Sequence, residues 1–222
     1  MSNIKACIFD LDGVLVDTTI YHYLAWKRLA NELGFDFSEQ QNEELKGVSR
    51  MKSLEILLAI GNLTVSEDMK EILSDRKNQW YCEHIGKITE DVILPGAKEL
   101  IEKLRDKKIK IALGSASKNA ITILKNIDLI RQFDVIIDGN KVTNAKPDPE
   151  VFLLAAKELG VDPKECVVFE DAQAGIEAAV NAGMASVGVG DPLLLFKADI
   201  VISSLEKITL DEIYSINRPV TF

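Results

Sequence analysis

The spacing of hydrophobic residues changes along the chain and divides the sequence into three parts. Residues 4–9 form a short apolar run that ends in Asp-Leu-Asp-Gly, which predicts a buried strand with a loop at its carboxyl end. Residues from about 18 to 88 show helical spacing and little strand signal. From residue 94 onward, segments with helical and strand patterns alternate.

The middle part predicts a small domain built of helices. Apolar residues recur every three or four positions within 23–33 and again within 54–58. Ser66 is a good N-cap for a third helix that continues to about His84. Gly47 is expected to interrupt the chain between two of these helices.

The last part predicts a parallel sheet with helices on both faces. The expected helices are 97–107, 119–126, 149–160 (with Asp148 as N-cap) and 172–182, and the expected strands are 109–113, 134–137, 166–169, 185–189 and 200–202. Because the helical block separates the strand at 4–9 from the others, the block is most simply an insertion into an α/β domain. We expect this domain to comprise residues 1–16 and 90–222, and the inserted helical cap to comprise residues 17–89.

Composition and charge narrow the classes of function. The chain is 47% hydrophobic and 27% charged, which is ordinary for a globular protein. Its net charge of −9 argues against nonspecific binding to nucleic acid or to an acidic membrane. An anionic substrate would therefore have to be held by a few local cations and a metal ion.

Cysteine usage and the amino terminus suggest a cytoplasmic protein without a membrane span. The three cysteines, Cys7, Cys82 and Cys166, are odd in number and lack CxxC spacing, so no disulfide framework is expected. No apolar run reaches 18 residues, and Asp10 and Asp12 come before any signal-length apolar stretch could form. We expect a monomer.

Polar residues follow the predicted strands at the edge where open parallel sheets bind ligands. These positions hold carboxylates, a hydroxyl group and a cation: Asp10, Asp12, Ser115, Lys146, Glu170 and Asp171. The acidic residues would repel one another without a cation, and carboxylate oxygens suit Mg²⁺. The pattern therefore predicts Mg²⁺-dependent phosphoryl transfer, with Ser115 and Lys146 on the phosphate. The simpler alternatives are a pair of turn aspartates and a solvated surface lysine.

Four segments in order, DLDGVLVDT, GSASKN, AKPDPEVF and FEDAQAGIEAA, resemble the motifs of the haloacid dehalogenase superfamily, in its phosphatase and phosphomutase branch. The resemblance covers nearly the whole chain. It implies an α/β fold with a Rossmann-like three-layer core and an inserted α-helical cap. It further implies that Asp10 is the nucleophile that becomes an aspartyl phosphate and that Asp12 is a general acid/base. Magnesium would be held by Asp10, the backbone carbonyl of Asp12 and Asp171, with Glu170 close by.

Within the cap, YHYLAW, LKGVSR and RKN resemble the β-phosphoglucomutase subfamily. That subfamily interconverts β-glucose 1-phosphate and glucose 6-phosphate through β-glucose 1,6-bisphosphate, so the resemblance implies a phosphorylated hexose as substrate and a second phosphate site. The implied phosphate and sugar contacts are Arg50, Ser115, Ala116, Ser117, Lys118, Asn119, Lys46, Gly47, Ser53, Trp26 and Leu45. Thr18, His22 and Lys77 would connect the hinge and the cap to Asp12.

Two other functions compete with this hypothesis. A sugar-phosphate phosphatase would use the same scaffold with a single phosphate site, and a regulatory protein would bind sugar phosphates through a decayed site. Individual cap residues also have simpler interpretations: Arg50 and Lys46 as solvated charges, Trp26 as helix core, and His22 as a structural histidine. A mutase would need the cap to close, with pivots expected near Thr18 and residues 88–94, so that water does not reach the phosphorylated aspartate.

Overall fold

The computed structural model describes residues 4–45 and 48–216. Two of the expected substrate contacts, Lys46 and Gly47, lie outside the described residues, as does the expected helix break at Gly47. The described chain forms one six-stranded parallel sheet in the order β3-β2-β1-β4-β5-β6. Its strands are β1 (Ala6–Phe9), β2 (Lys110–Gly114), β3 (Val135–Ile137), β4 (Cys166–Glu170), β5 (Ala185–Val189) and β6 (Ile200–Ile202).

The helices divide between the sheet and a separate cluster. Those packed around the sheet are α5 (Ala97–Asp106), α6 (Ala120–Asn126), α7 (Glu150–Leu159), α8 (Gln173–Asn181) and α9 (Leu210–Ser215). Those of the cluster are α1 (Thr19–Glu32), α2 (Glu39–Asn42), α3 (Arg50–Ile60) and α4 (Glu67–Ile85). Short 3-10 helices are η1 (Glu43–Leu45), η2 (Glu90–Val92), η3 (Ile130–Gln132), η4 (Pro163–Glu165) and η5 (Leu205–Lys207).

The core consists of three layers because successive side chains of each strand point to opposite faces. On β1, Cys7 and Phe9 join the apolar cluster that contains residues of α5, α6 and α9, whereas Ala6 and Ile8 join the one that contains residues of α7 and α8. This arrangement confirms the predicted Rossmann-like α/β core with helices on both faces of a parallel sheet.

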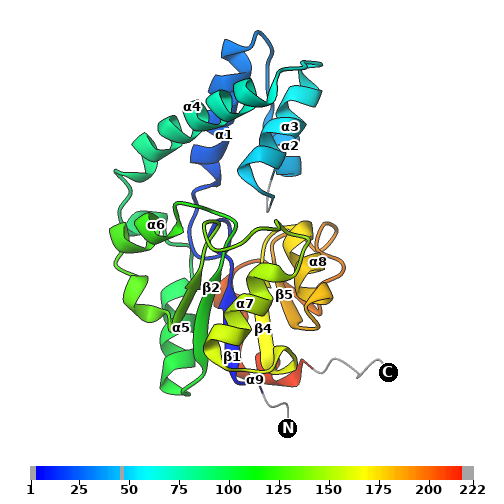
Figure 1. Cartoon of the computed structure of the whole chain (residues 1–222). Helices are drawn as coiled ribbons and strands as arrows, with labels where there is room; N and C mark the ends of the chain where they lie inside the picture. Colours follow the sequence, from blue (N-terminus) through cyan, green and yellow to red (C-terminus); the bar gives the residue numbers. More distant parts are fainter. Residues whose placement is uncertain (1–3, 46–47, 217–222) are drawn as a thin grey trace.

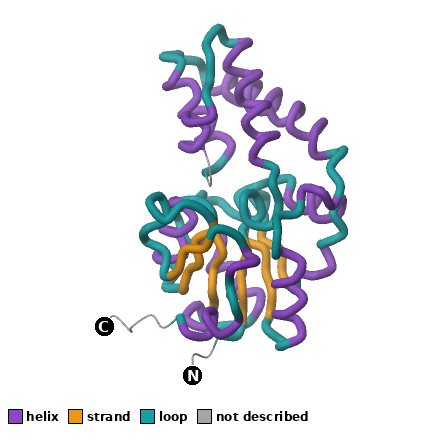
Figure 2. Tube along the Cα trace, turned by 180° about the vertical axis from the view of Figure 1, so that it is seen from behind, coloured by secondary structure: helices purple, strands orange, loops and turns teal. Residues whose placement is uncertain are grey.

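The helical cluster lies beyond the carboxyl edge of the sheet (Figure 1). Seen from behind, strands are confined to one half of the molecule, while the other half contains only helices and loops (Figure 2). Buried apolar residues of α1, α3 and α4, among them Trp26, Leu57 and Tyr81, pack the cluster internally. This is the segment that the sequence identifies as an inserted cap; its boundaries at residues 17 and 89 stay a prediction.

The register of the central strands places their last residues side by side. Phe9 of β1 pairs with Leu113 of β2 and with Phe169 of β4. The N–H of Asp10 donates to the carbonyl of Phe169 at 2.9 Å, so the pairing extends one residue beyond β1. Chain segments that are far apart in sequence therefore deliver their polar residues to a single edge.

A few elements differ from the sequence prediction. The helix expected from Pro149 begins at Glu150, although the Asp148 carboxylate does accept the N–H of Glu150 at 2.9 Å. The short helices α2 and α9 were not predicted, because neither is long enough to show helical periodicity. Both begin with a capping box, at Ser38 and Thr209, which is the signal that could have revealed them. Among the described helices, none is both long and apolar enough to cross a membrane.

The stack of Phe9 on Phe169 should be a main anchor of the sheet. Their ring centroids are 4.6 Å apart, and both side chains are fully buried. Phe169→Ala should lower the free energy of unfolding in urea by about 3–5 kcal/mol, since it removes a ring from a packed core. Phe196→Ala is the matched control: this ring is 65% exposed, and its loss should change stability by less than about 0.5 kcal/mol. Equal losses in the two variants would show that the stack is not an anchor.

Candidate active site

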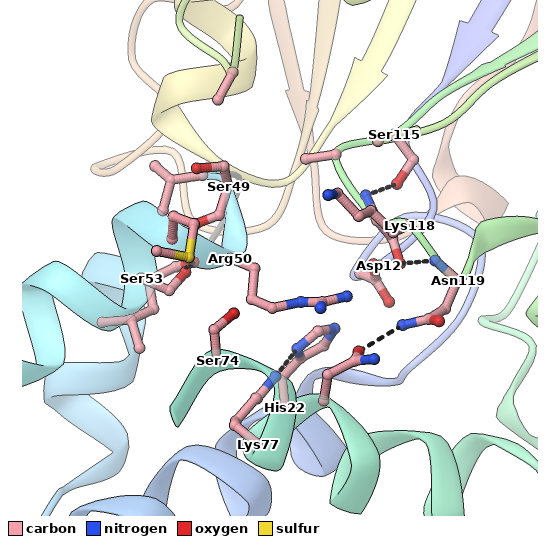
Figure 3. Close-up of a pocket in the computed structure, with 18 of the residues that line it drawn as sticks. Asp12, His22, Ser49, Arg50, Ser53, Ser74, Lys77, Ser115, Lys118 and Asn119 are labelled. Atoms are coloured by element: carbon pink, nitrogen blue, oxygen red, sulfur yellow. Dashed lines mark hydrogen bonds between the residues drawn. The ribbon is translucent and has the colours of Figure 1, made fainter. Parts of the chain in front are cut away.

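A cavity of about 570 Å³ lies between the helical cluster and the carboxyl edge of the sheet, and residues of both parts line it (Figure 3). Most predicted site residues line this cavity: Asp10, Asp12, His22, Trp26, Leu45, Arg50, Ser53, Lys77, Ser115, Ala116, Ser117, Lys118, Asn119 and Asp171. Three others, Thr18, Lys146 and Glu170, do not line it but are buried and contact residues around its floor. The structure thus brings together the residues that the sequence singled out.

A buried ion pair forms the floor of the site. Nζ of Lys146 lies 2.6 Å from Oδ1 of Asp10 and 3.5 Å from Oε1 of Glu170. Lys146 is 3% exposed and Glu170 is fully buried, so the alternative of a solvated surface lysine is wrong. Burial alone would lower the pKa of Lys146, but the charges of Asp10 and Glu170 outweigh it and raise that pKa, so the lysine stays charged.

Three carboxylates gather around this lysine. Asp10, Glu170 and Asp171 each offer an oxygen, and these oxygens lie within 4.8 Å of one another. Burial raises the pKa of Glu170, with the charges of Asp10 and Asp171 adding to it and that of Lys146 opposing it. The loop after β1 leaves room for Asp171: Gly13 has a φ of 81°, and a Cβ there would lie 2.1 Å from Oδ2 of Asp171. These hard oxygen donors fit a magnesium ion.

The carboxylate of Asp12 has a different environment from that of Asp10. It accepts a hydrogen bond from the hydroxyl of Thr18, which is fully buried. Burial, with the charge of Asp10 adding to it, raises the pKa of Asp12 to about 6, although Thr18 and nearby lysines oppose the shift. A carboxyl group with a pKa in this range can both accept and donate a proton near neutral pH.

His22 of α1, which is partly buried, and Lys77 of α4, which is buried, form a second pair. Nζ of Lys77 lies 2.8 Å from Nδ1 of His22. Burial lowers the pKa of His22 well below its usual value, and burial together with Arg50 lowers the pKa of Lys77 to about 7. The ammonium of Lys77 lies 4.5 Å from the ring centre of Trp26, so Trp26, at 2% exposure, serves both as helix core and as cavity wall.

The loop between β2 and α6 is held by its own hydroxyl groups. Oγ of Ser115 accepts the N–H of Ser117 at 3.1 Å, and Oγ of Ser117 accepts the N–H of Asn119 at 3.2 Å. Figure 3 shows these bonds, with Lys118 and Asn119 beside the cavity. These bonds fix the backbone of the loop, and a serine hydroxyl that accepts an N–H still has its own hydrogen to donate to an anion in the cavity.

Arg50 extends from the first turn of α3 into the cavity, opposite Asn119 (Figure 3). The helix begins there because Ser49 caps it, accepting the N–H of Lys52 at 3.3 Å. Burial lowers the pKa of Arg50, and its Nη1 lies 3.8 Å from Asp75. Its guanidinium is thus half-buried and is not simply solvated.

The side chain of Ser53 lines the cavity but also forms hydrogen bonds within the cap. Its hydroxyl donates within the cap, lying 3.2 Å from the carbonyl of Ser49 and 3.4 Å from that of Leu45. The hydrogen is therefore used to hold η1 against α3, and only the oxygen of Ser53 is left to accept from a ligand.

Several lining residues escaped the sequence analysis. Ser74 and Asn78 share a face of α4 with Lys77, and Asn42 and Thr143 contribute from other segments. Asn78 belongs to the RKN segment noted in the sequence, and Ser74 lies three residues before Lys77 and four before Asn78, a spacing that places it on the same side of the helix. Asn42 and Thr143 carried no comparable signal.

The chain is similar to several known proteins. The chain is 43% identical to β-phosphoglucomutase of Bacillus subtilis, covering 93% of this chain and 92% of that protein. It is 36% identical to a phosphorylated carbohydrates phosphatase of Thermotoga maritima, covering 81% and 82%. The crystal structure of β-phosphoglucomutase from Clostridium difficile superposes with a TM-score of 0.90 at 46% identity, covering 95% of each chain.

A family model agrees with the four motifs and with the fold. The model of the haloacid dehalogenase-like hydrolases matches residues 4–183, which include every motif that the sequence analysis singled out. The resemblance noted from those motifs is thereby confirmed: the chain belongs to the haloacid dehalogenase-like hydrolase family.

Proposed function

We propose that this protein is a β-phosphoglucomutase, which interconverts β-glucose 1-phosphate and glucose 6-phosphate. The observation that carries the proposal is a single cavity with groups suited to phosphate at two places. One is the floor, with Asp10 and Ser115, and the other lies between Arg50 and the loop that ends at Asn119. A mutase needs both places, because its bisphosphate intermediate must bind in two orientations. The names of the similar proteins in Bacillus and Clostridium support the same reaction.

Asp10 is the nucleophile of the proposed cycle. Phosphorylated Asp10 transfers its phosphoryl group to the 6-hydroxyl of β-glucose 1-phosphate, which gives β-glucose 1,6-bisphosphate and a free carboxylate. The bisphosphate then binds in its second orientation. The free carboxylate attacks the phosphorus at position 1, the bond to O1 breaks, and glucose 6-phosphate leaves. Lys146 accompanies Asp10 throughout, and its charge stabilises the carboxylate and the phosphoryl oxygens.

Asp12 moves the proton in both half-reactions. Its carboxylate takes the proton of the 6-hydroxyl as that oxygen attacks, and the resulting acid gives the proton to O1 as it leaves. The pKa of about 6, raised by burial, suits a group that must perform both tasks. We assign to Thr18 the positioning of this carboxylate, and to the pair of His22 and Lys77 a link between the cap and the acid/base.

The other residues bind magnesium and substrate. Asp10, Asp171, Glu170 and the backbone carbonyl of Asp12 would hold Mg²⁺. When bound, the ion supplies positive charge against the charge of the transferring phosphoryl group. We assign the second phosphate to Arg50, Ser117, Lys118 and Asn119, and the sugar to the surfaces of Trp26 and Leu45.

A sugar-phosphate phosphatase is the second candidate, because the relative from Thermotoga maritima carries that name at 36% identity. In that case, water and not a sugar hydroxyl would receive the phosphoryl group from Asp10.

One assay separates the two candidates. The protein is given β-glucose 1-phosphate, Mg²⁺ and a trace of β-glucose 1,6-bisphosphate, and both glucose 6-phosphate and free phosphate are followed. We expect fast isomerisation with little free phosphate, because the second phosphate site returns the bisphosphate to Asp10. Release of one phosphate for each glucose 1-phosphate consumed would contradict the mutase and support the phosphatase.

Arg50→Lys tests the second phosphate site. The change keeps the charge but removes the planar fork, so isomerisation should fall roughly 10- to 100-fold in kcat/KM. Attack on acetyl phosphate, which has a single phosphate, should fall far less. The matched control is Arg76→Lys on the outer surface of the cap, where the guanidinium lies 3.3 Å from Glu32. If isomerisation and the attack on acetyl phosphate fell equally in Arg50→Lys, Arg50 would maintain the structure of the cap and would not bind the second phosphate.

The pH dependence tests the role of Asp12. Transfer from phosphorylated Asp10 to the sugar needs Asp12 as a carboxylate, so its rate should fall as pH drops through about 6, the raised pKa of that group. The bond from Thr18 favours the ionised form, so Thr18→Val should raise this pKa and move the acidic limb to higher pH. Rapid-quench measurement of the phosphoenzyme follows the step. Thr89→Val, which removes an exposed bond to Asp91, is the control, and an unshifted limb in Thr18→Val would contradict the assignment.

A further inference from the structure

The side chain of Asn119 is held by the cap at both ends of its carboxamide. Its Nδ2 donates to Oδ1 of Asn78 at 3.1 Å, and its Oδ1 accepts from Sγ of Cys82 at 3.6 Å. Asn78 and Cys82 are four residues apart on α4 and so lie on one helical face. A single face of the cap thus engages a residue of the core loop twice.

These contacts select one of the two orientations of the carboxamide. In the observed orientation the amide nitrogen faces an acceptor and the amide oxygen faces a donor. A turn of 180° would place the oxygen against the oxygen of Asn78 and the nitrogen against the thiol hydrogen of Cys82. With Asn78 oriented as it is in the structure, the first contact would be repulsive, and the thiol of Cys82 would have to turn its hydrogen away and accept weakly; the observed arrangement of both residues therefore favours the same orientation of Asn119.

The favoured orientation suits an anion. The amide nitrogen carries two hydrogens, and Asn78 uses one of them. Asn78 and Asn119 both line the cavity, so the second hydrogen can be offered to a ligand there. The reversed carboxamide would instead present its oxygen to the ligand, which would repel a phosphate.

At Asn119 the backbone is held in place, so the orientation of the carboxamide is the main remaining degree of freedom. The N–H of Asn119 is fixed on Oγ of Ser117, so the backbone of the loop is already set. Arg50 extends into the cavity from the opposite side (Figure 3). The two α4 residues therefore act beside the place where the second phosphate is proposed to bind.

We propose that Asn78 and Cys82 are positioning residues that orient the carboxamide of Asn119 so that its N–H faces the second phosphate of the substrate. This inference rests on the proposed function and names two residues that set the affinity of its second phosphate site. Neither residue needs to contact the substrate itself.

Binding of glucose 6-phosphate, followed by calorimetry, tests the proposal. Asn78→Ala and Cys82→Val should each weaken binding by about 3- to 10-fold, since each removes one of the two orienting hydrogen bonds. Cys82→Ser keeps a donor and should stay within about twofold of the wild type.

Asn126→Ala is the matched control. Nδ2 of Asn126 donates to the carbonyl of Ile85 at 2.9 Å, so this variant breaks another bond between α6 and α4 but lies outside the cavity lining. It should leave glucose 6-phosphate binding unchanged. Equal weakening in Asn126→Ala and Asn78→Ala would mean that general docking of the two helices matters, and the proposal would be overturned.

A double-mutant cycle makes the test specific. On an Asn119→Ala background, Asn78→Ala should cause no further loss, because the residue that it orients is gone. Additive losses would overturn the proposal. If Asn78→Ala does not fold, the comparison of Cys82→Val with Cys82→Ser tests the proposal instead. Equal affinity of these two variants for glucose 6-phosphate would overturn the proposal.

This experiment and the test of the proposed function can fail separately. Binding of glucose 6-phosphate needs no turnover, so it can be measured whether the wild type isomerises or only hydrolyses. Isomerisation without the expected losses would overturn the role of Asn78 and Cys82 alone. The expected losses in a protein that only hydrolyses would overturn the mutase and leave the positioning role in place.

Discussion

The buried charge of Lys146 is the constraint on which the active site depends. Its ammonium is held between the carboxylates of Asp10 and Glu170, residues that leave neighbouring strands of the sheet. An unpaired charge at this depth would be strongly destabilising, so the lysine is tolerable only where both strands end at the same level. The parallel register of β1 and β4 provides this, and the same register gathers the carboxylates that suit magnesium.

The same arrangement gives different surroundings to two aspartates that are only two residues apart. Asp10 shares the floor with Lys146, whose Nζ lies 2.6 Å from its Oδ1. Asp12 lies beside Thr18 near the cap, where burial and the charge of Asp10 raise its pKa to about 6. In the proposed cycle, this difference in surroundings is what allows one short loop to supply both the nucleophile and the acid/base.

The fold of the core and its acidic edge could be predicted from the sequence, because both depend on local patterns of hydrophobic residues and on the types of residue at strand ends. Strand and helix patterns predicted the sheet, and the position of Asp10, Asp12 and Asp171 at strand ends predicted the acidic edge. The burial of Lys146 could not be read from AKPDP, since it depends on the packing of the segment against β1 and β4. Likewise, the inward use of the Ser53 hydroxyl and the contact of Asn78 with Asn119 depend on how η1, α3 and α4 fold in space.

Helix α4 connects the two ends of the cavity. Lys77 faces His22 and acts electrostatically on Asp12, whereas the adjacent Asn78 contacts Asn119 on the loop after β2. A shift of this helix would therefore change the surroundings of Asp12 and of Asn119 together. One helix thus carries both sets of contacts, so the position of α4 is linked to the surroundings of both residues.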